Sequence, residues 1–578
     1  MNHSIHEQLK LAVATFFIAA AWLFPYFSLG YRDTQQQLLA LGLLSGASLL
    51  CGMKSVRRSA IAPLLFLIFL IAVVSDQSIQ GKITGISGLL LAIVAMHLGA
   101  KLRQKPYLLP WFLFAIVAAA FVNAFEGLLQ WFGLVGELYR WVAEPERRGV
   151  AFGAFRQTNL FATFLCIGSV CTVWLVHRRK LSESMAWFIL SGLIFGVAAS
   201  GSRTGSLELL VLAVLAWSGR KQQAPAVTRL LVGQVGVLAA AMTLLTISAR
   251  WLEFEFSSGA ERVSQVGLDG RFRIWSNALQ LIAARPWAGW GWSETAYGHY
   301  ITLFDYRYDG MLGNVHNLPL QMAVEFGLPA TALLIIVVIQ AVCSARPWRL
   351  GSVDFNKLGQ NATGSAQDQR FAWFILIFIV GVHSMLEYPL WHGGFLYLAG
   401  LFLGYLYPVG TEGRVISNYM RWSTHAAKFV AVSLLVLALA AWQQYARLLP
   451  IYKTPFTNDR AVQRTAVAAA LSTADDAWLF REQLDFAKLG LLDVTVKNAF
   501  EVRQLAEKLL HFSAEPRVIQ PLLLSLWYLD DQTALNFHVE RFCHAFPVAF
   551  ERWSQDPANH ALNTAVIAPK TGCRPMIQ

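Results

Sequence analysis

Charged side chains are scarce in this sequence of 578 residues. Only 14% of the residues are Asp, Glu, Lys or Arg and 56% are hydrophobic, whereas ordinary soluble domains are about 25% charged. This shortage excludes a wholly soluble globular protein. We also expect no cleavable signal peptide, because the first apolar run, at 9–27, is too long and no small-residue cleavage site follows it.

Cysteine is also rare, and its spacing excludes the usual metal sites. The chain has 6 Cys residues and contains no CxxC or Cys/His zinc spacing, so we expect no metal site of that kind. Four of them fall in or beside apolar runs, where they act as small apolar residues: Cys51, Cys166, Cys171 and Cys343. The other two, Cys543 and Cys573, lie near the carboxy terminus.

The apolar residues gather in runs of about 20 residues with few charges, which predict membrane-spanning helices. Thirteen such runs occur, at 9–27, 37–53, 60–75, 84–99, 107–132, 158–177, 185–200, 204–218, 228–248, 317–343, 371–386, 393–408 and 426–446. The chain is therefore expected to cross a membrane many times.

The net charge of +12 reports on topology rather than on a nucleic-acid partner. Residues 446–578 hold 14 Lys+Arg and 14 Asp+Glu, so the whole excess lies in the apolar part. There the basic residues lie in every second connection between predicted helices, such as 54–58, 101–105 and 178–180. The positive-inside rule places these connections in the cytoplasm. We therefore expect the amino terminus inside, and the long loop before residue 317 and the tail outside.

These patterns predict an all-α polytopic membrane protein with a large external loop and a helical carboxy-terminal external domain. Nine transmembrane helices, the loop, four more transmembrane helices and the soluble domain occupy 1–248, 249–316, 317–446 and 447–578. In the last part charges recur every few residues among Ala and Leu, as in short amphipathic helices. No convincing 34-residue repeat occurs there.

The loop at 249–316 contains one segment with helical periodicity and a cluster of tryptophans. From residue 269 to 284 the apolar side chains fall on one face, as in a helix lying on the membrane surface: Phe272, Trp275, Ala278, Leu279 and Ile282. The segment that follows contains Trp287, Trp290 and Trp292, whose indole rings favour the headgroup level. For each Trp alone, anchoring at the membrane interface is the simpler interpretation.

An external tail makes a disulfide between Cys543 and Cys573 a further hypothesis, because the compartment is oxidising. On the chain-entropy model, a loop of this size would stabilise the tail by about 3–4 kcal/mol. The alternative is a pair of thiols, since separation along the sequence alone does not bring two Cβ atoms together.

Four short polar segments interrupt the apolar pattern, and the topology puts all of them at the external face. They are 153–159, with Arg156, Gln157 and Asn159; 200–205, with Arg203; 271–275, with Arg273; and His316 and Asn317, paired with Glu387 and Tyr388 in 387–392. Singly, such residues cap helices or snorkel to headgroups. Ionisable groups at a membrane boundary are costly, so their gathering at one face indicates a functional site.

The chemistry of these groups suits transfer of a sugar from a lipid pyrophosphate. The leaving pyrophosphate needs cations, and Arg203 and Arg273 supply them as planar forks that grip two oxygens. The attacking hydroxyl needs a base. Histidine changes charge near neutral pH, which favours His316, and Glu387 is a competitor for the role.

In this order the polar segments resemble the bacterial O-antigen ligase and polymerase superfamily, and within it the PglL-type protein O-oligosaccharyltransferases. The matching segments are 153–159, 202–205, 273–275 with 286–291, 315–317 with Gly327, and 387–391. The His-Asn pair that follows a long loop is the most specific of them.

The resemblance implies a GT-C-like, metal-independent glycosyltransferase of the bacterial inner membrane, with its active site facing the periplasm and no cofactor. It would move a glycan en bloc from undecaprenyl pyrophosphate to Ser or Thr hydroxyls of periplasmic proteins such as pilins. His316 would be essential, with Gln157 and Tyr388 as important partners. Taking the residues and the resemblance together, we expect the catalytic residues to be His316, Glu387 and Tyr388, and the substrate-binding residues to be Arg156, Gln157, Asn159, Arg203, Arg273 and Asn317.

Two alternatives stay open. An O-antigen ligase or polysaccharide polymerase of the same superfamily would use a glycan as acceptor, whereas the extra tail favours a protein that a soluble domain could dock. A transporter or flippase for lipid-linked glycans would place polar residues near the bilayer midplane, often in inverted repeats, and we find neither. The glycan, the acceptor, Ser versus Thr, the oligomeric state and whether His316 acts as base or as pyrophosphate-positioning donor all stay open.

Overall fold

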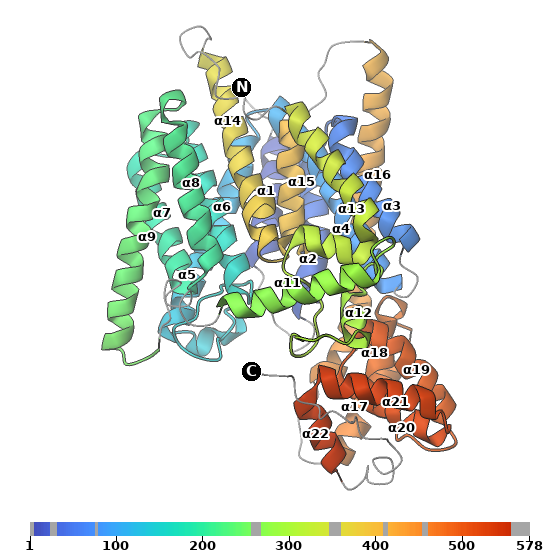
Figure 1. Ribbon diagram of the computed structural model, residues 1–578. Helices are drawn as coiled ribbons and strands as arrows, with labels where there is room; N and C mark the ends of the chain where they lie inside the picture. The colour runs from blue at the N-terminus through green and yellow to red at the C-terminus, as the bar shows by residue number, and fades with distance from the viewer. Residues whose placement is uncertain are drawn as a thin grey trace. The chain divides into compact units, whose positions relative to one another are not determined.

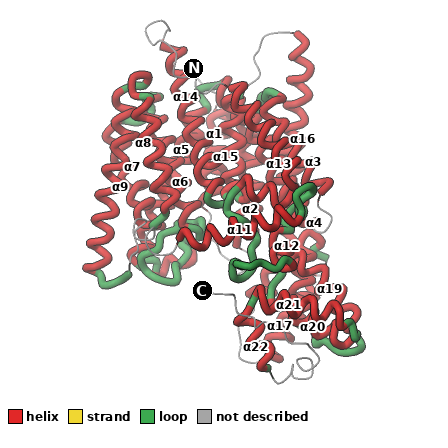
Figure 2. The backbone as a smooth tube through the Cα atoms, in the orientation of Figure 1, coloured by secondary structure: helices red, strands yellow, loops and turns green. Residues whose placement is uncertain are grey.

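The computed structural model is helical in the part of the chain that it describes, which comprises residues 5–23, 32–74, 79–255, 267–345, 360–407, 414–453, 460–474 and 476–556. No β-strand occurs in these ranges (Figure 1; Figure 2). The long apolar runs account for this, because a backbone inside a bilayer satisfies its polar groups only as helix or closed barrel. The expected all-α polytopic membrane protein is confirmed.

Each of the thirteen predicted runs overlaps a helix. These helices are α1 (Ile5–Leu23), α2 (Arg32–Cys51), α3 (Arg58–Val74), α4 (Ile79–Gln104), α5 (Leu109–Phe132), α6 (Thr158–His177), α7 (Glu183–Ser200), α8 (Arg203–Ser218), α9 (Pro225–Trp251), α13 (Leu318–Ala345), α14 (Gln360–Leu376), α15 (Gly393–Leu406) and α16 (Arg414–Lys453). Among the described residues, α4, α5, α6, α7, α9, α13 and α16 contain the seven spans long and apolar enough to cross a membrane. The number of crossings therefore stays a prediction.

The remaining helices belong to the loop and the tail. The loop contains α11 (Gly267–Ala284) and α12 (Thr295–Ile301). The tail contains α17 (Arg460–Ala474), α18 (Arg481–Leu489), α19 (Ala499–Phe512), α20 (Pro516–Tyr528), α21 (Gln532–Ala545) and α22 (Pro547–Gln555). The helical loop segment and the helical tail thus form as expected.

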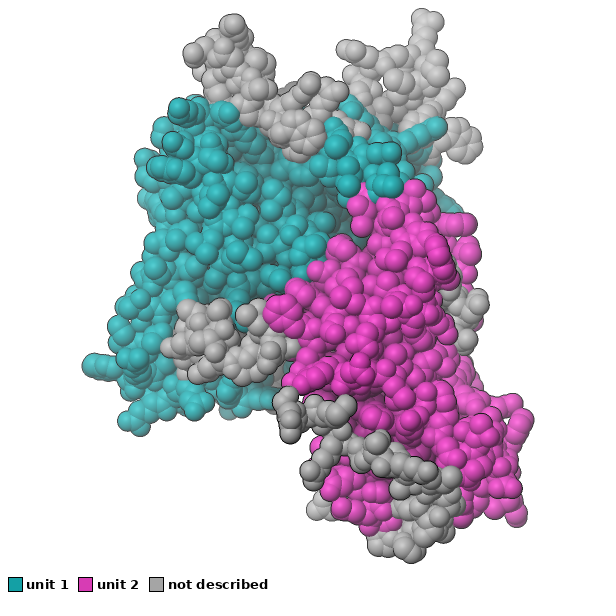
Figure 3. Space-filling model, in the orientation of Figure 1, with its two compact units in different colours: residues 1–65, 87–267, 336–440 teal, residues 66–86, 268–335, 441–578 magenta. Residues whose placement is uncertain are grey.

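The chain forms two compact units that do not follow the order of the sequence (Figure 3). Unit 1 comprises residues 1–65, 87–267 and 336–440. Unit 2 comprises residues 66–86, 268–335 and 441–578. Unit 2 therefore contains the end of α3 and the start of α4, the long loop from residue 268 onward, the start of α13, and the tail with the end of α16.

Unit 1 is built around α6, whose apolar window is 89% buried, against 33% for that of α9. Small residues let its helices approach closely, as in other membrane bundles. A methyl group at Gly168 would lie 2.5 Å from the Cβ of Ala120, and one at Gly205 would lie 2.6 Å from the Cβ of Ala162. The close approach of Gly205 to Ala162 lies near the amino-terminal ends of α6 and α8 and brings these ends together.

In unit 2, α11 buries only part of the apolar face expected of it. Its buried side chains are Ile274, Ala278, Leu281 and Ile282, which pack with Val315 and Val324. Phe272 and Leu279 are 59% and 58% exposed. The predicted single stripe is thus divided between the loop's own core and the outside, and contact of the exposed half with a membrane stays a prediction.

The tail of unit 2 has a core of its own, which includes one loop residue. Tyr300 of α12 is buried among side chains of α19, α20 and α21, such as Leu509, Leu522 and Phe542. On α21, Cys543 forms a disulfide. Its predicted partner, Cys573, lies outside the described residues, so the pairing stays a prediction.

Candidate functional site

Side chains from three of the predicted polar segments meet in unit 1. The carboxyl group of Glu387 accepts a hydrogen bond from Asn159 Nδ2 at 3.0 Å and one from Gln157 Nε2 at 3.4 Å. The hydroxyl of Ser202 donates to Asn159 Oδ1 at 2.7 Å. We call Gln157, Asn159, Ser202 and Glu387 the amide–carboxyl cluster.

Helix ends place these side chains. Gln157 is the N-cap residue of α6, and Ser202 is the N-cap residue of α8. The Ser202 hydroxyl also accepts a hydrogen bond from the Gly205 amide at 3.1 Å, as expected of an N-cap serine. Two helix amino termini, with their positive dipole ends, thus adjoin the cluster. They favour an anionic group there.

Buried amides of α5 hold the loop that precedes α6. The Gln130 side chain accepts from the Gly153 amide at 2.8 Å, and that of Asn123 accepts from the Ala154 amide at 2.9 Å. Gly153 has a left-handed backbone, with φ of 52°. A methyl group there would lie 2.7 Å from Asn123 Oδ1. The glycine of this motif therefore permits the turn that delivers Gln157.

The two predicted arginines of unit 1, Arg156 and Arg203, are sequence neighbours of Gln157 and Ser202 in the cluster. Arg156 precedes Gln157 and has a left-handed φ of 56°, which is uncommon for a non-glycine residue. Arg203 is the first residue of α8 and is half-buried. Each of the two arginines is therefore adjacent in sequence to a residue of the amide–carboxyl cluster.

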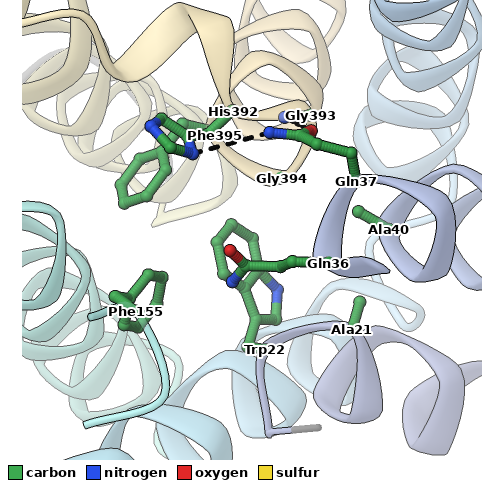
Figure 4. Close-up of a pocket in the computed structure, with 10 residues that line it drawn as sticks. All are labelled: Ala21, Trp22, Gln36, Gln37, Ala40, Phe155, His392, Gly393, Gly394 and Phe395. Carbon is green, nitrogen blue, oxygen red and sulfur yellow. Dashed lines mark hydrogen bonds between the residues drawn. The ribbon is translucent and has the colours of Figure 1, made fainter. Parts of the chain in front are cut away.

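Tyr388 lies beside a pocket of unit 1 that is lined by aromatic side chains. Its ring stacks on His392, with centroids 6.0 Å apart and ring planes 20° apart. His392, Trp22 and Phe155 line the pocket, together with the carboxamides of Gln36 and Gln37 (Figure 4). Tyr388 therefore contacts one lining residue, His392, and Phe155, the residue before Arg156, is another lining residue.

The sequence predictions missed a buried polar group formed by Thr163 of α6, Glu208 of α8 and His383 of the short helix His383–Met385. Thr163 Oγ1 donates to Glu208 Oε1 at 2.8 Å and lies 2.8 Å from His383 Nδ1. The His383 carbonyl in turn accepts the Glu387 amide at 2.8 Å. Glu208 is the single carboxylate of α8, and an ionisable residue within an apolar span is itself an indication of function.

His316 lies in unit 2, on a turn held by side chains. Its backbone is left-handed, with φ of 54°, and its amide donates to Asn314 Oδ1 at 2.8 Å. Asn317 Oδ1 accepts the Leu320 amide at 3.1 Å and so caps the start of α13. The imidazole is half-buried. Asn317 thus has a structural role beside any contact with substrate.

Arg273 also lies in unit 2, on the exposed side of α11. Its guanidinium carbon is 5.9 Å from the centre of the Tyr306 ring. One hydrogen bond connects its helix to the His316 segment: Trp275, on the same helix, donates its indole N–H to the Val315 carbonyl at 3.2 Å. The structure thus brings Arg273, His316 and Asn317 into one unit and the other predicted residues into the other. The meeting of the two groups in one site stays a prediction.

The tryptophan segment packs against the break in α13. Trp290 donates its amide to the Val324 carbonyl at 2.8 Å, and the Leu328 amide donates to the Pro286 carbonyl at 2.8 Å. Gly289 and Gly327 have left-handed φ of 69° and 77°, and a methyl group on either would overlap backbone of the other segment. The glycines of this motif therefore serve a backbone-to-backbone contact.

The three tryptophans of that segment differ in role. Trp290 donates its indole N–H to the Leu281 carbonyl, and Trp292 donates its own to the Gly81 carbonyl, both at 3.0 Å. Packing within unit 2 accounts for these two. Trp287 is 80% exposed and is the one suited to the interfacial anchoring expected of all three.

Two segments of the chain match known protein families. Residues 186–335 match the family described as O-antigen ligase, and residues 371–561 match the family described as virulence factor membrane-bound polymerase, C-terminal. A general O-oligosaccharyltransferase of Acinetobacter baylyi is 23% identical over 310 residues. That alignment covers 52% of this chain and 51% of the relative, so the chain spans about half the length of the curated protein it matches.

Proposed function

We propose that this chain, a member of the O-antigen ligase superfamily, transfers a lipid-linked glycan en bloc to hydroxyl groups of periplasmic proteins. The observation that carries the proposal is the O-antigen ligase match over 186–335, which includes Arg203, Arg273 and His316. These are the residues that the chemistry of pyrophosphate departure and hydroxyl attack requires. The named activity of the Acinetobacter relative supports a protein acceptor.

The donor in this proposal is a glycan on undecaprenyl pyrophosphate, at the outer side of the inner membrane. A Ser or Thr hydroxyl attacks the anomeric carbon, and the bond from that carbon to the pyrophosphate oxygen breaks. His316 takes the hydroxyl proton, and the arginines stabilise the charge on the departing pyrophosphate. The helix amino termini beside Arg203 add further positive potential for that anion.

Glu387 has a supporting role in this mechanism. Both of its carboxyl oxygens are engaged by amide donors, from Asn159 and Gln157. A general base needs an accessible lone pair, and Glu387 is buried. This arrangement favours His316 over Glu387 as base and leaves Glu387 to orient Gln157 for the substrate.

The proposal assigns charge stabilisation to arginine rather than to a metal ion. A planar guanidinium can bond two phosphate oxygens at once. We therefore expect a chelator such as EDTA to leave turnover of the purified enzyme unchanged. Complete inhibition that added divalent metal reverses would contradict this part of the proposal.

A second candidate function is polymerisation or ligation of polysaccharide, with a glycan in place of the protein acceptor. The observation that favours it is the polymerase match over 371–561, which includes Glu387, Tyr388 and most of the tail. The donor chemistry would be unchanged. The two functions differ only in what supplies the attacking hydroxyl.

Co-expression with a pathway for lipid-linked glycan tests both candidates in one experiment. Candidate acceptors such as pilins are purified and their intact masses measured, while glycan lipids from the same cells are separated by size. A mass increase of the acceptor by one whole glycan, absent with His316→Ala, supports protein glycosylation. Longer glycan lipids with unmodified acceptors would favour the polymerase instead.

A further inference from the structure

The backbone on either side of His316 is fixed by side chains. The Val315 amide donates to Gln321 Oε1 at 2.8 Å, and the His316 amide donates to Asn314 Oδ1 at 2.8 Å. A left-handed backbone is uncommon at a residue that has a side chain, and it persists only when its surroundings impose it. These two bonds are part of what imposes it.

Gln321 is the residue that joins this turn to the rest of unit 2. Its side chain is 1% exposed and makes three hydrogen bonds. Besides accepting from the Val315 amide, its Nε2 donates to Thr295 Oγ1 and to Glu325 Oε1, each at 2.9 Å. A buried amide is costly unless satisfied in this way, and both donors and the oxygen of the Gln321 side chain are engaged in this one arrangement.

Glu325 extends the arrangement to a second strained turn. Its Oε1 also accepts the Ser293 amide at 3.0 Å, and Ser293 has a left-handed φ of 68°. Thr295 and Glu325 are buried, as is Val315. We call Gln321, Glu325 and Thr295 the support triad.

The support triad reaches the carboxy-terminal domain through one residue. Glu294, which precedes Thr295 and is the N-cap residue of α12, lies 2.7 Å by its Oε2 from His511 Nδ1 on α19. The ring of His511 also stacks on Tyr297, with centroids 3.8 Å apart. Bonds and adjacent backbone thus connect the tail to the amide beside His316.

We infer that Gln321 is a positioning residue for His316, and that the carboxy-terminal domain supports it through the Glu294–His511 contact. The inference rests on the proposed function only in taking His316 to act in transfer. The tail then has a role besides docking an acceptor, because it also stabilises the turn that presents the imidazole. Misplacement of a catalytic group by about 1 Å costs about 100-fold in rate.

The simpler interpretation is that Gln321 is a satisfied core residue that contributes only to stability. Exchanging the side chains at positions 321 and 325 distinguishes a positioning role from a purely structural one. In Gln321→Glu the carboxylate can still accept from the Val315 amide, but it can no longer donate to Thr295 and it faces the carboxyl group of Glu325. The double variant Gln321→Glu with Glu325→Gln restores one donor and one acceptor between the two positions.

The experiment measures kcat, KM for the lipid-linked donor and the thermal midpoint of the purified full-length protein, for Gln321→Leu, Gln321→Glu and the double variant. We expect Gln321→Leu and Gln321→Glu to lower kcat by about 100-fold, with little change in KM for the donor. The double variant should recover most of that loss, as coupled neighbours do. His511→Ala should lower kcat by a smaller factor.

Two outcomes would overturn the inference. One is a Gln321→Leu protein with wild-type kcat beside an inactive His316→Ala protein. The other is loss of activity only in proportion to loss of folded protein, without recovery in the double variant. An active His316→Ala protein would instead reject the role of His316 in the proposed function, and the variants at 321 would then show no selective fall in kcat.

Discussion

The amide–carboxyl cluster of unit 1 and the His316 turn of unit 2 differ in what fixes their ionisable side chains. In unit 1 side chains bond side chains: Asn159 and Gln157 both donate to Glu387. In unit 2 side chains bond backbone, as Asn314 does to the His316 amide, and the imidazole itself stays half-buried. The first arrangement fixes a carboxyl group directly, whereas the second presents an imidazole ring on a fixed backbone.

His299, a second histidine of the loop that contains His316, has a different environment. His299 is buried, with Nε2 3.1 Å from Asn277 Oδ1 and Nδ1 3.1 Å from an Arg307 nitrogen. Burial, and then the charge of Arg307, hold the pKa of His299 well below its ordinary value. His299 is therefore neutral and structural, so a place in this loop does not by itself make a histidine catalytic.

The largest effect should follow from removing the imidazole that the His316 turn presents. His316→Ala should lower transfer by about 100- to 10,000-fold, the usual contribution of a general base, without loss of membrane insertion. The measurement is the rate of acceptor glycosylation at matched enzyme levels. His316→Gln keeps a hydrogen-bond donor but takes up no proton, so substantial activity in that variant would favour positioning of pyrophosphate over base catalysis.

Replacing one arginine in each unit compares their contributions to charge stabilisation. Arg203→Lys and Arg273→Lys should each reduce turnover by about 10- to 1000-fold, the scale of losing one stabilising donor. An ammonium keeps the charge but lacks the planar fork. Initial rates at saturating donor measure the effect. The control is Arg552→Lys, at an exposed position on α22. Full activity of both variants would show that these arginines only interact with headgroups.

The backbone contact between the tryptophan segment and α13, at Gly289 and Gly327, should be sensitive to single added methyl groups. Gly289→Ala and Gly327→Ala each place a Cβ into opposing backbone at a left-handed position, and we expect each to cost about 3 kcal/mol of stability. Thermal unfolding of the purified protein in detergent measures this. Gly313→Ala is the matched control in the same loop, because its added methyl group meets no atom within 4 Å. Equal midpoints for all three variants would contradict the contact.

Mild acid should weaken the tail that supports the loop. Burial, and then the cations Arg541 and Arg503, lower the pKa of His538 from 6.5 to about 4. The unfolded chain therefore binds more protons between these values, so stability is complete above pH 6.5 and falls as the pH drops toward 4. We expect a loss of about 2 kcal/mol, since partial exposure of His538 reduces the full effect. Hydrogen exchange of α20 and α21 in the intact protein measures it.

A matched variant isolates the histidine in that experiment. His538→Gln keeps a polar side chain beside the Tyr300 hydroxyl, which lies 3.1 Å from His538 Nδ1, but cannot take up a proton. Its exchange protection should change less between pH 6.5 and 4 than that of the wild type. The same loss of protection in both proteins would assign the effect to other groups.

The sequence by itself determined the helical class and the short segments that interrupt the apolar runs with polar residues. Apolar runs of about 20 residues have one stable form in a bilayer, because a helix satisfies its own backbone bonds. For the same local reason α11 was predictable from the spacing of Phe272, Ala278 and Ile282. These inferences need only residues that are close in the chain.

Tertiary structure alone decided which polar residues are partners. Asn159 and Glu387 are 228 positions apart, and their contact depends on how α6 is packed against its neighbours through small residues such as Gly168. Gln321 looks like one polar residue in an apolar helix until folding brings Thr295 beside it. Periodicity shows which face of a helix a residue occupies, but the partner of that face is set by packing between segments that are distant in sequence.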